Sequence, residues 1–494
     1  MKRIGMGLLV LLLVCGVTFS VAFGADEKAK EPAQSGKTSW AEISAQSPEN
    51  SPFQKRQHGH IADGVPDMVP QAYANYPRLV IDPELARKNG LQILNGERAV
   101  LVTDLEVTEE IRNLLPAIAD AYPQVCKYMG IKPDPNWKLS VYLMKDDFKF
   151  IDSNLLPEIL PPFQNGFSFN YDCWAREQPS AYYRQHLVIH EMIHSISTTM
   201  LGYAGPPWYA EGLAEMLATH TFGSKPLEIR VMPPNREAVP HYARVKELRD
   251  AVKRGEARPL LDVFNVTQQD YTTNAIYYWC WAMAWFLDNN PDSQEVFRSL
   301  PQLLTKCRDH REFTRTFIKQ LGDKLPSLEK QWQMFVATFD YGYELGPALF
   351  DTSEGEPLDY SKTTKLEISA QKGWQNTGIR LRKGESLRIT ASGRFEIYRS
   401  KKRSYPCEAG GVTIEYTHGA PMGILQAVIL PAEPVTKEEM NAFAEGSFFK
   451  PLNIGLDRKF QTPQSGTLLL RLNLPCKDFL KNKGAVQVEI AAER

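Results

Sequence analysis

Two patterns of hydrophobic and polar positions follow one another along the chain. Five helices are predicted in its second half, at 242–255, 274–289, 294–307, 311–321 and 327–339. Beyond Glu354 the pattern changes to short alternating runs broken by glycine, such as the run from Gly378 to Leu381. Alternation of this kind predicts an all-β sandwich or jelly roll for the last part of the chain.

The stretch before residue 180 predicts a small mixed sheet. Residues 98–104 are typical of a buried strand, and residues 137–143 alternate in the way of a second strand. Residues 166–172 alternate aromatic with small or polar side chains. This third segment is either an ordinary strand of the sheet or an edge strand to which an extended peptide can add through backbone hydrogen bonds.

The N-terminal segment has the three parts of a secretory signal peptide. Lys2 and Arg3 precede an apolar run at 6–21, and small residues lead up to Gly24. We expect cleavage after Gly24 and export to the periplasm or the medium. The alternatives are an uncleaved membrane anchor, for which the apolar run is short, and a lipoprotein processed at Cys15.

The linker and the composition narrow the class of protein. Residues 25–75 are rich in Pro, Ser, Gln, Ala and Lys and predict a disordered linker, whose role as a propeptide stays open. A formal net charge of −1 lacks the basic excess that phosphate binding needs, so no nucleic-acid partner is expected. Six of the seven cysteines lie beyond residue 24, and an exported protein permits disulfides among them. Cys407 with Cys476 is the pairing that we favour.

The candidate chemistry lies in a His-Glu-Met-Ile-His string that begins at His190. On a helix, positions i and i+4 project from one face, so His190 and His194 can point ring nitrogens at one metal ion. Glu191 lies one residue round the helix, where it can reach a water on the metal without binding the metal itself. His186, one turn earlier, can line the cleft. The string predicts a zinc-hydrolase site.

A third metal ligand has to come from another element, and Glu211 is the candidate. Residues 202–207 supply a turn after the motif helix. The two prolines at 206 and 207 begin a second helix, which carries Glu211 and Glu215 one turn apart. Two helices joined by a short loop can therefore bring a carboxylate to the two histidines.

The string together with Glu-Gly-Leu-Ala-Glu at 211–215 resembles the gluzincin metallopeptidases, the clan of thermolysin and the membrane-alanyl-type aminopeptidases. Residues 90–345 resemble more closely a family of exported bacterial gluzincin-like proteins known as peptidase MA-like. The shared elements are a strand near Val100, the motif helix, a Trp-x-x-Glu-Gly-x-Ala-Glu helix and a later helix with Tyr277 and Trp281.

This resemblance implies a role for each residue of the central stretch. His190, His194 and Glu211 are implied to bind Zn²⁺, with Glu191 as the general base. Glu215 falls where gluzincins place a carboxylate that orients the first histidine, and such partners fix the tautomer of a ligating ring.

Tyr277 has two interpretations. It falls in the region where the aminopeptidase branch keeps a tyrosine that stabilises the oxyanion, which implies a catalytic role. The alternative is a core position, because Tyr278 is adjacent and the helix is rich in tryptophan. The Gly-x-Met-Glu-Asn-type strand with which that branch recognises a free amine is not found in the sequence, which favours an endopeptidase or an uncommon specificity.

Residues 360–494 resemble the bacterial galactophilic lectin fold. The resemblance rests on the runs 374–379, 389–393 and 465–468 and implies sugar binding through calcium. Where that lectin has an Asn-Asp pair and a following Asn-Asn, this chain has Asn473 before leucine and Lys481 before Asn482. Because calcium takes six to eight oxygen ligands, we expect a sandwich without a competent calcium site, although Asp478 can offer one oxygen.

The sequence as a whole predicts a multidomain α+β protein. Its expected parts are a signal peptide at 1–24, a linker at 25–75, a gluzincin-like zinc peptidase domain at 76–350 and a lectin-like β-sandwich at 358–494. The expected substrate is a peptide or protein, and a glycan or cell-envelope component is the candidate ligand of the sandwich. The alternatives are a non-catalytic binding protein on the same scaffold and a metal-dependent hydrolase of a non-peptide amide.

Overall fold

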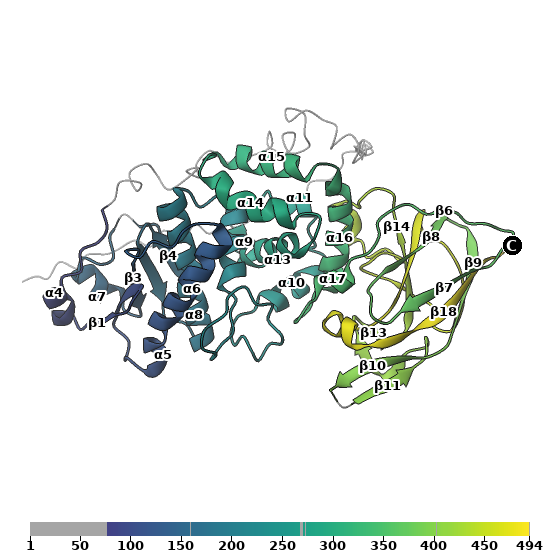
Figure 1. The fold of residues 1–494 in the computed structure, drawn as a ribbon, viewed down its shortest axis with the longest axis horizontal. Helices are drawn as coiled ribbons and strands as arrows, with labels where there is room; N and C mark the ends of the chain where they lie inside the picture. The colour runs from purple at the N-terminus through teal and green to yellow at the C-terminus, as the bar shows by residue number, and fades with distance from the viewer. Residues whose placement is uncertain (1–76, 159, 267–269, 272, 402, 494) are drawn as a thin grey trace, which may run out of the picture. The chain divides into compact units, whose positions relative to one another are not determined.

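The computed structural model describes residues 77–493, apart from residues 159, 267–269, 272 and 402. The predicted signal peptide and linker lie outside the described residues. The described chain is mixed α and β with several sheets, as Figure 1 shows. Within these ranges, no helix is both long enough and apolar enough to span a bilayer.

A five-stranded mixed sheet comes first, with the strand order β1-β2-β3-β5-β4. Its strands are β1 Gln92–Asn95, β2 Ala99–Thr103, β3 Leu139–Met144, β4 Gly166–Phe169 and β5 Asp172–Arg176. β2, β3 and β5 run parallel, while β1 and β4 are antiparallel edge strands. The predicted small mixed sheet is confirmed.

The single strand predicted at 166–172 is wrong in one respect. Asn170 has φ +49°, a left-handed conformation that turns the chain back on itself. The segment therefore forms the β4–β5 hairpin, in which Gly166 pairs with Ala175 and Phe169 with Asp172. The hairpin leaves β4 at the edge of the sheet.

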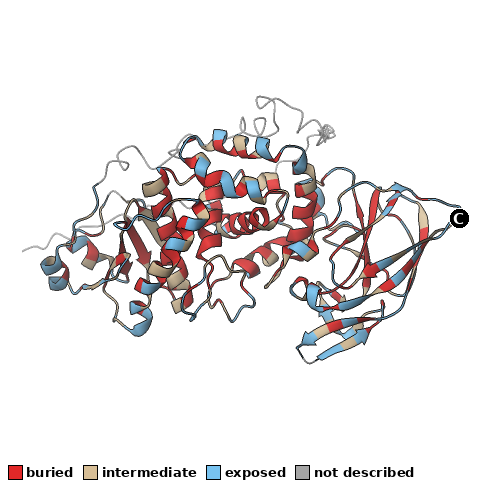
Figure 2. Cartoon of the chain, in the orientation of Figure 1, coloured by how far each residue is buried: buried red, intermediate tan, exposed pale blue. Residues whose placement is uncertain are grey.

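Helices pack against both faces of this sheet, because its alternating side chains belong to two separate hydrophobic clusters. The helices of this region are α4 Pro83–Lys88, α5 Glu109–Arg112, α6 Leu114–Met129, α7 Asp147–Asp152 and α8 Ala181–Ile196. α6 packs on β2, and α8 packs on β4 and β5. Ser180 caps the start of α8, because its hydroxyl accepts a hydrogen bond from the Tyr183 N–H at 3.1 Å. At its other end α8 continues into a π-helical turn, η2 Ser197–Leu201. The motif helix is therefore packed along its length, as the burial in Figure 2 shows.

A helical region follows the motif. Its helices are α9 Pro207–Ala218, α10 Arg244–Lys253, α11 Leu260–Val263, α13 Ala275–Asn289, α14 Gln294–Leu304, α15 His310–Leu321, η3 Gly322–Lys324, α16 Leu325–Thr338 and α17 Leu345–Ala348. All five helices predicted here are confirmed, with ends displaced by at most a few residues. α9 and α13 approach closely at Gly212, where a Cβ would lie 2.7 Å from the Cys280 carbonyl oxygen.

The last part of the chain is largely β, as predicted. A six-stranded sheet has the order β11-β10-β18-β9-β16 with β7 beside β18, a five-stranded sheet has the order β15-β14-β17-β8-β6, and β12 pairs with β13. Its elements are β6 Glu356–Pro357, β7 Thr364–Ser369, β8 Gln375–Leu381, β9 Ser386–Ser392, β10 Phe395–Ser400, β11 Arg403–Cys407, β12 Val412–Thr417, β13 Ala420–Met422, β14 Leu425–Leu430, α18 Lys437–Asn441, β15 Leu452–Asn453, β16 Asp457–Gln461, β17 Gly466–Leu472, η4 Cys476–Lys481 and β18 Lys483–Ala492. Buried side chains of both larger sheets belong to one hydrophobic cluster.

The favoured disulfide is not formed. All six cysteines in the described part of the chain are buried free thiols. The Cys407 thiol donates a hydrogen bond to the Glu408 carbonyl at 3.2 Å, whereas Cys476 lies beside Tyr343, and burial raises the pKa of its thiol to about 11. The two thiols have separate partners, so the pairing that we favoured from the sequence is wrong.

Candidate metal centre

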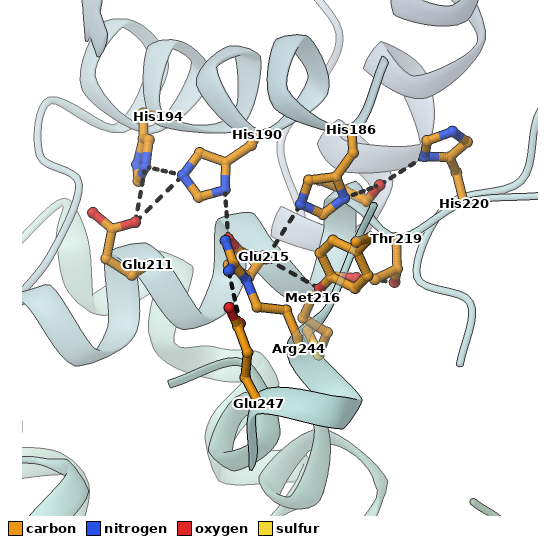
Figure 3. Close-up of polar contacts among 12 residues, drawn as sticks. His186, His190, His194, Glu211, Glu215, Met216, Thr219, His220, Arg244 and Glu247 are labelled. Carbon is orange, nitrogen blue, oxygen red and sulfur yellow. Dashed lines mark hydrogen bonds and ion pairs between the residues drawn. The ribbon is translucent and has the colours of Figure 1, made fainter. Parts of the chain in front are cut away.

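Helices α8 and α9 bring two histidines and a carboxylate to one point, as Figure 3 shows. His190 and His194 project from the same face of α8, and their Nε2 atoms lie 3.1 Å apart. Glu211 comes from α9, and its Oε2 lies 3.3 Å from Nε2 of His190 and 3.7 Å from Nε2 of His194. The three residues predicted as metal ligands are thus placed together.

The donor set fits a zinc ion. Tetrahedral zinc with bonds of about 2.0–2.1 Å holds its ligand atoms about 3.3 Å apart, which matches the three separations above. Oε2 of Glu211 is buried, and its contacts among the described residues are the two ion pairs with the histidine nitrogens, neither of which has hydrogen-bond geometry. A buried carboxylate oxygen without a hydrogen bond is costly, and a cation at this point removes that cost.

The buried charges of the site shift the pKa values of His190 and Glu211 in opposite directions. Burial alone would lower the pKa of His190, but the carboxylates of Glu211, Glu191 and Glu215 raise it to about 9. Burial alone would raise the pKa of Glu211, but His194 and His190 lower it to about 2. Glu211 is therefore ionised at neutral pH and supplies the negative charge that a divalent cation prefers.

Glu191 lies beside the three ligands and packs against the edge strand β4. A Cβ on Gly166 would collide with Oε1 of Glu191 and would lie 2.9 Å from Cδ1 of Leu187. Burial raises the pKa of Glu191, although His190, His194 and the Ser168 hydroxyl oppose the shift. The geometry puts a buried carboxyl group with raised proton affinity next to the donor set.

Glu215, on α9, lies below His190 in a buried polar network. Its Oε1 is 3.8 Å from Nδ1 of His190 and accepts a hydrogen bond from Nη2 of Arg244 at 2.9 Å. Its Oε2 accepts from the Tyr242 hydroxyl at 3.0 Å and lies 3.2 Å from Nε2 of His186. The structure thus places Glu215 near the first histidine, while its closest contacts are to three other side chains.

His186 does not line a cleft. Its side chain is buried, its Nδ1 lies 3.0 Å from the Ala218 carbonyl oxygen, and its ring lies 4.4 Å from that of Tyr242. His220 contacts the same carbonyl through Nδ1 at 2.8 Å. Both histidines fill the space between α8 and the end of α9.

Tyr277, in the first turn of α13, lies at the border of the site. Its ring centroid is 6.4 Å from that of His190 and 5.0 Å from Cζ of Arg244. Burial raises its pKa, and the charges of Glu211 and Glu191 raise it further, so the phenol keeps its proton at neutral pH. A protonated hydroxyl in this position is a hydrogen-bond donor.

Sequence reasoning missed four residues of the site: Arg244, Tyr242, Tyr271 and Gly166. The Tyr271 hydroxyl donates to Oε1 of Glu211 at 3.4 Å, and its ring meets that of Tyr277 edge to face at 6.1 Å. Arg244 lies 29 residues beyond Glu215, so no local period connects the two. Only the alternation around Gly166 had pointed to the right strand.

The lectin-like positions of the last part of the chain are occupied by internal contacts. The Asn473 amide donates to the carbonyls of Thr417, Ala420 and Pro421, and its oxygen lies 3.4 Å from Nη2 of Arg471. Lys481 donates to Oδ1 of Asp478 at 3.0 Å. The oxygen that Asp478 offered as a calcium ligand already has a cationic partner.

Comparisons with known proteins give weak likenesses. No protein-family model matches the chain, and no curated protein matches it. A solved PllA-like lectin, the EclA N-terminal domain, matches 26% of this chain and 95% of its own, at 19% identity and a TM-score of 0.19. An aminopeptidase N family protein from Idiomarina loihiensis matches 82% of this chain and 69% of its own, at 11% identity and a TM-score of 0.25. With TM-scores this low, the function has to be inferred from the geometry of the site.

Proposed function

We propose that this chain is an exported zinc-dependent metallopeptidase of the gluzincin type, which hydrolyses peptide bonds with Glu191 as general base. The observation that carries the proposal is the convergence of His190, His194 and Glu211 beside the Glu191 carboxylate. In this proposal the part at 76–350 carries the chemistry. The part at 358–494 is a lectin-like sandwich that binds a glycan or another cell-envelope component.

The residues of the site divide the work of hydrolysis. Bound Zn²⁺ supplies a Lewis acid that acidifies a water molecule and polarises a carbonyl oxygen. Glu191 accepts the proton from the attacking water and passes it to the leaving amine, a role favoured by its raised pKa. Tyr277 keeps its proton and can donate a hydrogen bond to the oxyanion that develops on the substrate.

The edge strand β4 supports a peptide as the substrate. β4 pairs with β5 on one side and is the last strand of the sheet on the other. An extended peptide can add to such an edge through backbone hydrogen bonds. Because the backbone of Gly166 touches the Glu191 carboxylate, a peptide on this edge runs past the general base. We infer an endopeptidase, since the sequence has no strand of the type that recognises a free amine.

Metal content and peptide cleavage test the proposal together. We expect one zinc per full-length chain by mass spectrometry of metals, and cleavage of a peptide library that EDTA abolishes and added zinc restores. Glu191→Gln should retain zinc and lose hydrolysis by about 100-fold or more. Glu295→Gln, exposed on α14, is the matched control and should behave as the wild type. Unchanged turnover in Glu191→Gln would contradict the proposal, and a wild-type chain that neither binds zinc nor cleaves would favour the non-catalytic alternative.

A further inference from the structure

Arg244 is a buried guanidinium at the start of α10 that belongs to the polar network around Glu215. Its side chain is only 9% exposed. Nη2 donates to Oε1 of Glu215 at 2.9 Å, and Nη1 donates to Oε2 of Glu247 at 3.0 Å. Figure 3 shows this chain of contacts from Glu247 through Arg244 to Glu215 and on to His190.

The same guanidinium lies close to two tyrosine rings. Its Cζ is 5.0 Å from the ring centroid of Tyr277 and 5.6 Å from that of Tyr242. A guanidinium over an aromatic face is attracted to it, most strongly where water is excluded. Arg244 is thus in contact with the candidate oxyanion donor and with the residue whose hydroxyl also binds Glu215.

Burial of this charge needs an explanation beyond stability. A buried ion pair seldom adds net stability, because the loss of hydration offsets the attraction of the two charges. What it does provide is a fixed geometry, and the planar guanidinium holds its donors in a rigid fork. Here that fork holds Glu215 at a point 3.8 Å from Nδ1 of His190, on the side of the ring away from Nε2.

We propose that Arg244 is a positioning residue, which fixes Glu215 against the first metal-binding histidine and holds the ring of Tyr277 beside it. This inference rests on the proposed function, since it assigns a role relative to the metal and the oxyanion. Arg244 itself contacts neither His190 nor the metal-binding oxygen of Glu211. Its effect passes through Glu215 to the imidazole and through the ring contact to the phenol.

Zinc affinity is the first readout, because it does not depend on activity. We expect Arg244→Met to weaken zinc binding by about 10–100-fold, the loss typical of removing an outer partner of a metal ligand. Arg244→Lys keeps the positive charge but not the planar guanidinium. It should lose less zinc affinity than Arg244→Met and fold nearly as the wild type does. Arg249→Met is the matched control: Arg249 lies on the same helix and pairs with Asp340 at 2.6 Å, away from the centre. Competition against a chromophoric chelator measures all four chains.

Kinetics on a cleavable peptide supply the second readout. Arg244→Met should lower kcat and leave KM nearly unchanged. Combining it with Tyr277→Phe should cost less than the two single losses together, because without the hydroxyl there is no donor left for Arg244 to position through the ring contact. Additive losses would overturn the Tyr277 half of the inference.

The outcomes separate this inference from the proposed function. If the wild type binds zinc and both Arg244→Met and Arg244→Lys bind it with the wild-type affinity, the inference is overturned and the proposed function stands. A lowered melting temperature with unchanged zinc affinity and kcat would show that Arg244 is purely structural. A wild type without zinc affinity would overturn both.

Discussion

Gly166 in β4 and Glu191 in α8 are in direct contact, with no room for a side chain between them. A Cβ on Gly166 would lie 3.0 Å from Cδ of Glu191 and closer still to Oε1. The backbone of an edge strand therefore forms one wall around the candidate base. Strand β4, which can receive an extended peptide, thus packs directly against Glu191, which can accept a proton from water.

Gly166→Ala should displace the Glu191 carboxylate and reduce turnover. A misplacement of about 1 Å can cost on the order of 100-fold in rate, so we expect a fall in kcat of about 10–100-fold with zinc content unchanged. Gly346→Ala is the matched control, because a Cβ there meets no atom within 4 Å and its φ is not positive. Peptide cleavage and metal analysis of both variants check this. Wild-type kcat in Gly166→Ala would show that the contact does not matter for the reaction.

Removal of the metal should lower the stability of the wild type, and it should have little effect on the stability of Glu211→Gln, which lacks the third candidate ligand. A ligand present at 100 times its Kd stabilises the folded state by about 2.7 kcal/mol, so EDTA should lower the melting temperature of the wild type by several degrees. Glu211→Gln loses the charged ligand and should show little response to EDTA. Glu312→Gln, on the exposed side of α15, should respond as the wild type does. An equal response of Glu211→Gln and the wild type would argue against Glu211 as a ligand.

Glu329, on α16, should make the stability of the chain fall as pH rises. Its side chain is fully buried, Oε1 accepts from the Leu260 N–H at 3.0 Å, and Oε2 has no hydrogen-bond partner among the described residues. Burial raises its pKa from 4.5 to about 8. The folded chain therefore holds a proton that the unfolded chain has lost between these two values, and the stabilisation is complete below pH 4.5 and lost as pH rises through 8.

The matching variant is Glu329→Gln, which cannot ionise. It should lose this part of the pH dependence, which amounts to about 1.4 kcal/mol per pH unit between the two pKa values. At pH 9 it should be the more stable chain, because the wild type then buries a charged carboxylate whose Oε2 has no hydrogen bond among the described residues. Urea unfolding at pH 5, 7 and 9 measures the difference, with Glu295→Gln as the control. Parallel pH profiles for the wild type and Glu329→Gln would refute the assignment.

Calcium should not bind at the lectin-like positions of the last part of the chain. The Asn473 amide is held by three backbone carbonyls, and Lys481 neutralises Asp478. Too few oxygens are left for an ion that takes six to eight. Isothermal titration of calcium into the full chain should give no saturable heat. Tight binding that Asp478→Asn removes would contradict this expectation.

Much of the fold followed from local pattern. Helices such as α10, α14 and α15 and strands such as β9 could be predicted because each buries one face, which imposes a period of 3.6 or 2 on the sequence. By contrast, α13, β14 and β17 are buried on nearly every side. The candidate metal-binding group could be predicted from helical spacing: His190 and His194 are one turn apart on α8, and Glu211 follows on α9. The β4–β5 hairpin was missed because its turn depends on the backbone conformation of one asparagine.

The sequence by itself determined the candidate metal ligands and the neighbouring Glu191, because one helix and the start of the next contain all of them. Only the tertiary structure decided what surrounds them: that β4 closes against Glu191 through Gly166, and that Arg244 reaches Glu215 from a helix 29 residues further on. Contacts between such distant segments depend on how helices and strands pack, and no period along the chain records them. The ligands of the centre are local, whereas the groups that hold them in place come from the whole fold.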